Sequence, residues 1–324
     1  MYPADVSQDR PLDVFMAHMD VVFSDETELP LRVEDGRIYC PGVGDDTACL
    51  VCLLLAGKYI ARHVDSPSWR EIRGEDAPGL LLVCNAGEEG LGNLKGVRKI
   101  CEDYGGRIKS FCTFDSSLSS IVDRAVGSKR FRVKVRTRGG HSYNDFGNDN
   151  AIAGLASLVG KLYKIQVPEG GKTTYNVGMI SGGTSVNTIA QEAGMLYEFR
   201  SDKRENLEYM ERQFMEGLDR AKAEGMDVSF QVIGVRPCEG QVDPAQKQAL
   251  ADWAHRVVEE MTGQAPKHHA GSTDCNIPLS LGIPSVCVGS FRGAGAHTRE
   301  EYVETDSLEE GYKVAFGMIF GRRD

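Results

Sequence analysis

Short apolar segments that end in charged residues recur along the first part of this chain. They are LDVFMAHMD (12–20), GLLLVCNAGEE (79–89) and FCTFD (111–115). A helical segment, DDTACLVCLLLAGKYIARH (45–63), lies between the first two, and Asp45 is its candidate N-cap. Strands that alternate with helices predict an α/β fold built on a mainly parallel sheet. Function gathers at the carboxyl ends of such strands, so we expect the charged ends to converge.

The middle of the chain has a different pattern, which predicts a second domain. Its segments are, in order, a strand at 129–137, a helix at 151–165, strands at 173–181 and 193–201, a helix at 207–225 and a strand at 227–235. This β-α-β-β-α-β order is that of a ferredoxin-like unit. A helical segment (247–263) and a strand-like one (283–290) follow it. We therefore predict a domain at 125–235 inserted into one formed by 1–124 and 236–324.

The composition argues against several classes of protein. The length of 324 residues suits about two domains, and 41% apolar with 26% charged residues is typical of a globular protein. The net charge of −10 argues against a nucleic-acid surface and favours a soluble cytoplasmic protein. No stretch reaches the ~18 apolar residues of a membrane helix, and the first residues do not resemble a signal peptide.

The nine cysteines are scattered and do not form a disulfide framework, which fits a reduced cytoplasmic compartment. Cys49 and Cys52 have the spacing of a CxxC motif, but they lie in an apolar helical run. We expect them to be core thiols.

Two histidines and four carboxylates stand at or near the ends of predicted strands and turns. They are His18, Asp45, Glu88, Glu89, Asp115 and His297. Two His, two Asp and one Glu form a ligand set for two divalent metals that share a carboxylate. The remaining Glu, beside a ligand, can act as a base. This is the equipment of a two-metal hydrolase.

Each signal also has an ordinary structural interpretation. His18 and Asp20 share a face if both lie on a strand, so the carboxylate can orient the imidazole, but HxD also occurs by chance. Asp45 can simply cap a helix, a role compatible with metal binding. Glu88 and Glu89 can form a charged loop, and they face one site only if the strand has ended before them.

The order of the motifs is more specific than any one of them. HMD, GDD, GEEG, FDSS, GGHS, GGTSVNTIA, GSTDCNIP and AHT–EEY resemble, in that order, family twenty of the metallopeptidases. This dinuclear-zinc group contains peptidase T, glutamate carboxypeptidase, acetylornithine deacetylase and succinyl-diaminopimelate desuccinylase. The resemblance covers nearly the whole chain and implies a zinc-peptidase-like fold with an inserted dimerisation or lid domain.

The resemblance implies a role for each site residue. One zinc is held by His18, Asp45 and Asp115, and the other by Asp45, Glu89 and His297. Asp20 orients His18. Glu88 takes a proton from a metal-bridging water and returns it to the leaving amine. Cobalt or manganese also suits these ligands.

Further residues match the family's substrate-binding positions. His141 resembles the histidine that reaches the partner subunit's site, which implies a homodimer. Asn187 and Arg200, thirteen residues apart, resemble the substrate-binding pair, and Gly271 and Ser272 begin the substrate-pocket loop. The alternatives are a turn histidine, an ordinary loop amide and an ion pair of Arg200 with Asp202 or Glu205.

Asp at the Asp115 position favours, through the resemblance, a di- or tripeptide aminopeptidase. The alternative is an N-acyl-amino-acid deacylase or a carboxypeptidase of the same family. The family has more chain before its HMD motif, and Thr47 and Ala48 stand where it often has Lys and Gly. A truncated, catalytically silent peptide-binding scaffold is therefore a second alternative, which metal content would distinguish.

Overall fold

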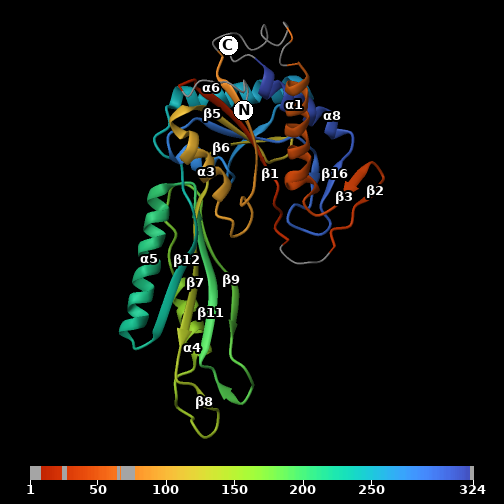
Figure 1. Ribbon diagram of the computed structural model, residues 1–324. Helices are drawn as coiled ribbons and strands as arrows, with labels where there is room; N and C mark the ends of the chain where they lie inside the picture. The colour runs from red at the N-terminus through yellow and green to blue at the C-terminus, as the bar shows by residue number, and fades with distance from the viewer. Residues whose placement is uncertain (1–8, 24–27, 64–65, 67–76, 322–324) are drawn as a thin grey trace. The chain divides into compact units, whose positions relative to one another are not determined.

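A computed structural model describes residues 9–23, 28–63, 66 and 77–321 (Figure 1). The chain divides into two compact units. Unit 1 comprises Met1–Ala125 and Glu239–Asp324, and unit 2 comprises Val126–Cys238. None of the helices among the described residues has the length and apolarity that crossing a membrane requires.

Unit 1 is built on a six-stranded sheet in the order β13-β6-β14-β5-β1-β4. The strands are β1 (Leu12–His18), β4 (Gly79–Asn85), β5 (Ile108–Phe114), β6 (Ser120–Ala125), β13 (Lys267–Gly271) and β14 (Ser285–Val288). All neighbouring pairs are parallel except β14 with β6. The prediction of a mainly parallel α/β sheet is thus confirmed, and β1 lies between the two other strands that end in charged segments.

Helices cover both faces of this sheet. They are α1 (Cys49–His63), α3 (Lys95–Tyr104), α6 (Pro244–Thr262), the short α7 (Asn276–Ser280) and α8 (Ser307–Phe320), with a 3-10 turn, η2, at Gly105–Arg107. Phe15 and Ala17 of β1 pack in the core formed with α1, α6 and α8, whereas Val14 and Met16 pack in the core formed with α3 and α7. Because successive strand residues point to opposite faces, a strand covered on both sides must be apolar throughout.

Cys49 and Cys52 are buried in the first of these cores, as expected for core thiols.

A second, small sheet in unit 1 was not predicted from the sequence. It has the order β15-β16-β3-β2. Its strands are β2 (Arg32–Glu34), β3 (Arg37–Tyr39), β15 (Gly293–Ala294) and β16 (Tyr302–Glu304). Antiparallel pairing of β16 with β3 brings the segment that leads to Asp45 beside the segment that follows His297.

Unit 2 has its six main elements in the expected β-α-β-β-α-β order. They are β7 (Gly127–Arg136), α4 (Ala151–Leu162), β9 (Thr173–Gly182), β11 (Glu192–Ser201), α5 (Arg204–Ala223) and β12 (Asp227–Arg236). The antiparallel sheet has the order β12-β7-β11-β9, and a small ladder joins β8 (Gly140–His141) to β10 (Thr188–Ile189). Phe131, Phe199 and Phe214 lie in the core between sheet and helices.

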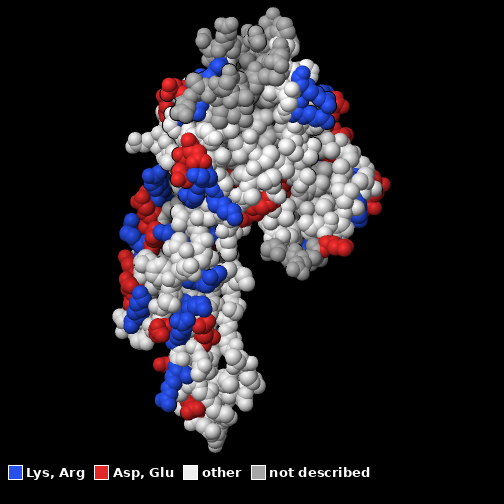
Figure 2. All heavy atoms as spheres, viewed as in Figure 1, with Lys and Arg blue, Asp and Glu red and all other residues white. Residues whose placement is uncertain are grey.

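Charged side chains of both signs are intermingled on the face of unit 2 that Figure 2 shows. Lys134 and Arg136 of β7 both pair with Glu192 of β11, and Lys129 pairs with Glu211 of α5. Exposed pairs of this kind contribute little to stability, about 0–1 kcal/mol each, and Glu192 and Glu211 offset part of the positive charge of β7.

Candidate metal centre

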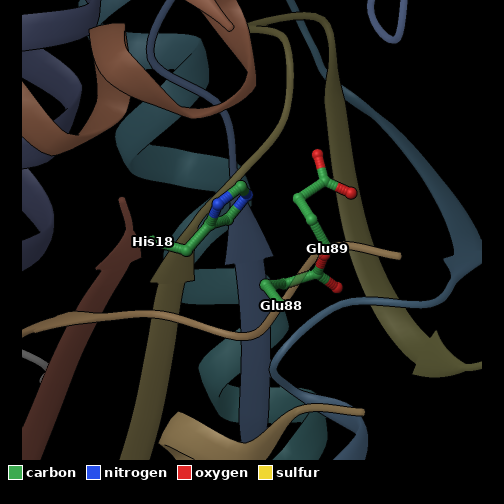
Figure 3. Close-up of side chains that lie close together, drawn as sticks. All are labelled: His18, Glu88 and Glu89. Atoms are coloured by element: carbon green, nitrogen blue, oxygen red, sulfur yellow. The ribbon is translucent and has the colours of Figure 1, made fainter. Parts of the chain in front are cut away.

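The predicted site residues of β1, β4 and β5 lie at the carboxyl ends of these strands in the sheet of unit 1. His18 is the last residue of β1, and Asp115 directly follows β5. Glu88 and Glu89 stand in the loop after β4, which ends at Asn85, so the strand has ended before them as the adjacent pair required. Figure 3 shows the His18 imidazole close to the side chains of Glu88 and Glu89.

Asp45 lies between the two histidines of the site. Its Oδ1 is 3.1 Å from Nε2 of His18, and its Oδ2 is 3.0 Å from Nε2 of His297. Each carboxylate oxygen therefore faces a different imidazole, which is the arrangement of a carboxylate that bridges two cations. Asp115 Oδ1 is 3.8 Å from His18 Nε2, and Glu89 Oε1 is 3.4 Å from His297 Nε2.

Among the described residues, three sets of side chains could each hold a metal ion, because the potential ligand atoms within each set lie within 4.8 Å of one another. They are Asp45, Glu89 and His297; His18, Asp46 and Asp115; and His18, Glu88 and Glu89. The first set is the one that the family resemblance implies. In the second, Asp46 stands where the resemblance implies Asp45. We favour Asp45, because Asp46 Oδ2 already accepts the backbone N–H of His18 at 2.9 Å.

The site carries more negative charge than its own residues can balance. Burial, reinforced by the charges of Asp45 and Glu88, raises the pKa of Glu89 to about 8. Burial alone would lower the pKa of His18, but the neighbouring carboxylates of Asp115 and Asp45 raise it. Glu89 Oε1 is buried without a hydrogen bond, although His297 Nε2 is 3.4 Å away. Carboxylate and imidazole donors around uncompensated charge fit divalent metal ions.

Asp45 does not cap a helix, contrary to the expectation for 45–63. Residues Val43–Ala48 form an irregular helical turn (η1) in which Asp45 has φ −101° and ψ 87°, and α1 begins only at Cys49. The residue before this turn, Gly42, has no side chain that could cap it. The Asp45 carboxylate faces the two histidines instead.

Asp20 contacts the site differently from the prediction. The strand ends at His18, so the two residues do not share a strand face. The backbone carbonyl oxygen of Asp20, not its carboxylate, bonds His18 Nδ1 at 2.9 Å, while the carboxylate is 3.7 Å away. That carboxylate accepts the backbone N–H groups of Gly87, Glu88 and Glu89, and so holds the loop of the paired glutamates.

Sequence reasoning missed Glu301, which is buried with 3% of its surface exposed. Its carboxylate accepts the backbone N–H groups of Gly42, Gly44 and Asp45 at 2.6, 2.9 and 2.8 Å. The EEY motif was part of the resemblance, but nothing in the local pattern assigned this residue a partner.

The predicted pocket loop begins at the end of β13 with Gly271 and Ser272. Its Asp274 is fully buried and accepts a hydrogen bond of 2.7 Å from Asn85 at the end of β4. Burial and the charge of Glu88 raise the pKa of Asp274 to about 8. The loop is therefore anchored beside the strand that leads to the paired glutamates.

Unit 2 holds the other predicted residues. His141 of β8 pairs with Thr188 of β10, and Ser142 donates its backbone N–H to the carbonyl of Asn187. His141 Nδ1 accepts the backbone N–H groups of Tyr143 and Asn144 at 3.2 and 3.4 Å, which leaves the proton of a neutral ring on Nε2.

Arg200 lies near the carboxyl end of β11, whereas His141 and Asn187 lie near the amino end of that strand. Its Nε and Nη2 donate to Glu198 at 2.8 and 3.1 Å, so its ion-pair partner is neither Asp202 nor Glu205. Residues i and i+2 of a strand share a face, which explains this pair.

The family model described as "Peptidase family M20/M25/M40" matches residues 14–320 of the chain. Among curated proteins, the chain is 24% identical to the succinyl-diaminopimelate desuccinylase of Nitrosomonas eutropha, covering 93% of this chain and 80% of that one. It is 26% identical to the acetylornithine deacetylase of Myxococcus xanthus, covering 86% and 71%.

Solved structures share its fold. The aminopeptidase PepT from Bacillus cereus has a TM-score of 0.69 at 22% identity, covering 97% of this chain and 82% of that one. A tripeptidase from Staphylococcus aureus has a TM-score of 0.70 at 21% identity, covering 96% and 80%.

Proposed function

The chain belongs to peptidase family M20/M25/M40 and is a metal-dependent hydrolase, and on that premise we propose that it is a di- or tripeptide aminopeptidase. The observation that supports a two-metal reaction is the position of Asp45, with one carboxylate oxygen toward His18 and the other toward His297. Glu88 stands next to the ligand Glu89 and is 5% exposed, so it is placed to act as a base.

Two divalent cations, proposed to be zinc, would polarise the scissile carbonyl and make a water molecule more acidic. Glu88 accepts the proton of the attacking water and delivers it to the leaving amine. Asp20 and its three backbone partners hold the Glu88–Glu89 loop while this proton moves. His141, with its proton on Nε2, is suited to donate a hydrogen bond to the carbonyl oxygen.

The proposal also specifies the substrate class, free di- and tripeptides rather than N-acyl amino acids. The fold resemblance to an aminopeptidase and a tripeptidase, together with Asp at position 115, supports cleavage of free peptides. The curated relatives named as a desuccinylase and a deacetylase support the competing activity, removal of an acyl group from an amino acid.

A matched substrate panel separates these activities. We expect purified protein loaded with Zn²⁺, Co²⁺ or Mn²⁺ to release the amino-terminal residue from free di- and tripeptides and to leave their N-acetylated forms intact. Identification of products by mass spectrometry is the measurement. Release of acetate would establish a deacylase, and release of the carboxyl-terminal residue from an acetylated peptide would establish a carboxypeptidase.

Metal content, measured on the same samples, tests the silent-scaffold alternative. Two bound equivalents without turnover of any compound would contradict the aminopeptidase and leave the metal centre standing. Failure to bind any metal would contradict the proposal that this chain catalyses hydrolysis and would favour the silent scaffold.

We also propose that the enzyme acts as a homodimer whose substrate contacts come from two chains. In unit 2, β8 with His141 lies beyond the Glu192 end of β11, while Arg200 stands at the opposite end (Figure 1). The eight residue-to-residue steps from Glu192 to Arg200 span roughly 26 Å, whereas an extended dipeptide is roughly 7 Å long. His141 and Arg200 of one chain are therefore too far apart to hold the same dipeptide.

The outer strand of the unit 2 sheet supports a second copy as the partner. β9 is an edge strand, and its Met179 and Ile180 are 65% and 58% exposed. An exposed apolar edge is a template for pairing with another strand.

Complementation tests this arrangement. We expect His141→Ala and Glu88→Ala each to be inactive, and a 1:1 co-expressed mixture to recover about a quarter of wild-type activity. Half of the dimers are then mixed, and one of the two sites in each has both an intact Glu88 and a partner's intact His141. The rate of peptide cleavage is the measurement. A mixture as inactive as the single variants would show that His141 does not act across subunits.

A further inference from the structure

Glu301 and the loop that carries Asp45 form one hydrogen-bonded unit in the metal centre of unit 1. Oε2 of Glu301 accepts the N–H of Gly42, and Oε1 accepts those of Gly44 and Asp45. Hydrogen bonds to an ionised acceptor are roughly twice as strong as neutral ones. Both oxygens are therefore engaged by the backbone of the loop, and Glu301 belongs to none of the three ligand sets among the described residues.

The same residue is tied to the loop that carries His297. It lies four positions after His297, its carbonyl oxygen accepts the N–H of Cys40 at 3.1 Å, and β16 begins directly after it. His297 itself has φ 64°, and a turn in which Thr298 bonds back to Gly295 precedes Glu301. Glu301 thus connects the segments of two residues that face each other, Asp45 and His297.

Close packing leaves this loop little freedom. A Cβ added to Gly44 would meet the Phe291 ring at 2.6 Å and Oε1 of Glu301 at 3.0 Å. Contacts under 3.0 Å force something to shift, so residue 44 can pack this closely against the Phe291 ring only because it has no side chain. Phe291 and the Glu301 carboxylate therefore both confine the backbone that leads into Asp45.

We propose that Glu301 is a positioning residue that fixes Asp45 against His297 and thereby sets the affinity of the metal position formed by Asp45, Glu89 and His297. The inference rests on the metal centre of the proposed function. It gives Glu301 no contact with metal or substrate, and its effect passes through the backbone of the Asp45 loop.

Two substitutions of Glu301 separate the effect of the carboxylate's position from the effect of its negative charge. Glu301→Asp keeps the negative charge but withdraws it by one methylene group, so the three hydrogen bonds cannot all form. Glu301→Gln keeps the shape but places an amide N–H₂ against a backbone N–H. Glu300→Gln is the matched control, because that neighbour is 80% exposed in its side chain and pairs only with Arg32 among the contacts described.

The measurement is titration of the metal-free proteins with Zn²⁺ against a chromophoric chelator, with the visible spectrum of the Co²⁺ form as an independent signature. We expect both Glu301 variants to raise the dissociation constant of one equivalent by roughly 10–100-fold, the usual effect of losing a residue that supports a ligand. The other equivalent should change less, and Glu300→Gln should match wild type.

Three results would overturn the inference. Wild-type dissociation constants in both Glu301 variants would show that the contacts do not set affinity. A loss in Glu301→Gln alone would assign the effect to charge. Loss of the folded far-ultraviolet circular dichroism spectrum in both variants would assign Glu301 to folding. If the wild-type chain itself bound no metal, the proposed function would fail instead.

Discussion

Replacing Glu88 by Gln is expected to lower kcat by about 10²–10⁴-fold while both metal equivalents remain bound. The side chain is buried beside Glu89, and Gln has the same shape but cannot accept a proton at neutral pH. Binding of substrate does not depend on that proton, so KM should change much less than kcat. Steady-state kinetics together with metal analysis are the measurements.

The same substitution at the adjacent Glu89 is the comparison that distinguishes a base from a metal ligand. Glu89→Gln should lose activity and metal together, because Glu89 and His297 face the same ligand position. Both glutamates lie within ligand distance of His18, so their roles could be exchanged. Loss of metal in Glu88→Gln, with metal retained in Glu89→Gln, would reverse the assignment. Glu102→Gln, on the exposed surface of α3, controls for the loss of one charge.

Replacing Asp45 by Asn is expected to reduce activity to background and to weaken both metal equivalents. Each carboxylate oxygen of Asp45 faces a different histidine, so one neutral amide cannot serve both positions. The contacts described for its side chain are with His18 and His297, so we expect the folded state to survive. Metal titration, peptide cleavage and thermal unfolding are the measurements.

Asp46→Asn is the matched control for Asp45. The Asp46 carboxylate bonds the backbone N–H of His18, and an Asn oxygen can accept the same bond. We therefore expect this variant to keep two metal equivalents and most of its activity. Loss of metal in Asp46→Asn, with retention in Asp45→Asn, would move the shared ligand to Asp46, as the set of His18, Asp46 and Asp115 allows.

The sequence alone was sufficient to predict that the charged strand ends meet. The strands β1, β4 and β5 are apolar runs, and a parallel sheet places all their carboxyl ends at one edge. His18, Asp115 and the paired glutamates consequently lie close together. The element order of unit 2 followed from its periodicity in the same way. Both outcomes depend on patterns that lie within short segments.

The helix predicted at 45–63 shows where local patterns mislead. Asp before an apolar periodic run is a common N-terminal signal for a helix. In the structure, Glu301 takes the backbone N–H groups of Gly44 and Asp45, and α1 begins only at Cys49. A residue 256 positions away in sequence from Asp45 thus overrides the local preference.

The element order and the residues gathered at the sheet edge were therefore determined by the sequence itself, because alternation of apolar and charged positions specifies strands, helices and their ends. Tertiary structure decided which groups support the site. Asp20 holds the glutamate loop and Glu301 holds the Asp45 loop, each through three backbone N–H groups. Every residue except proline has such a group, so no side-chain pattern indicates which of them a distant carboxylate will bind.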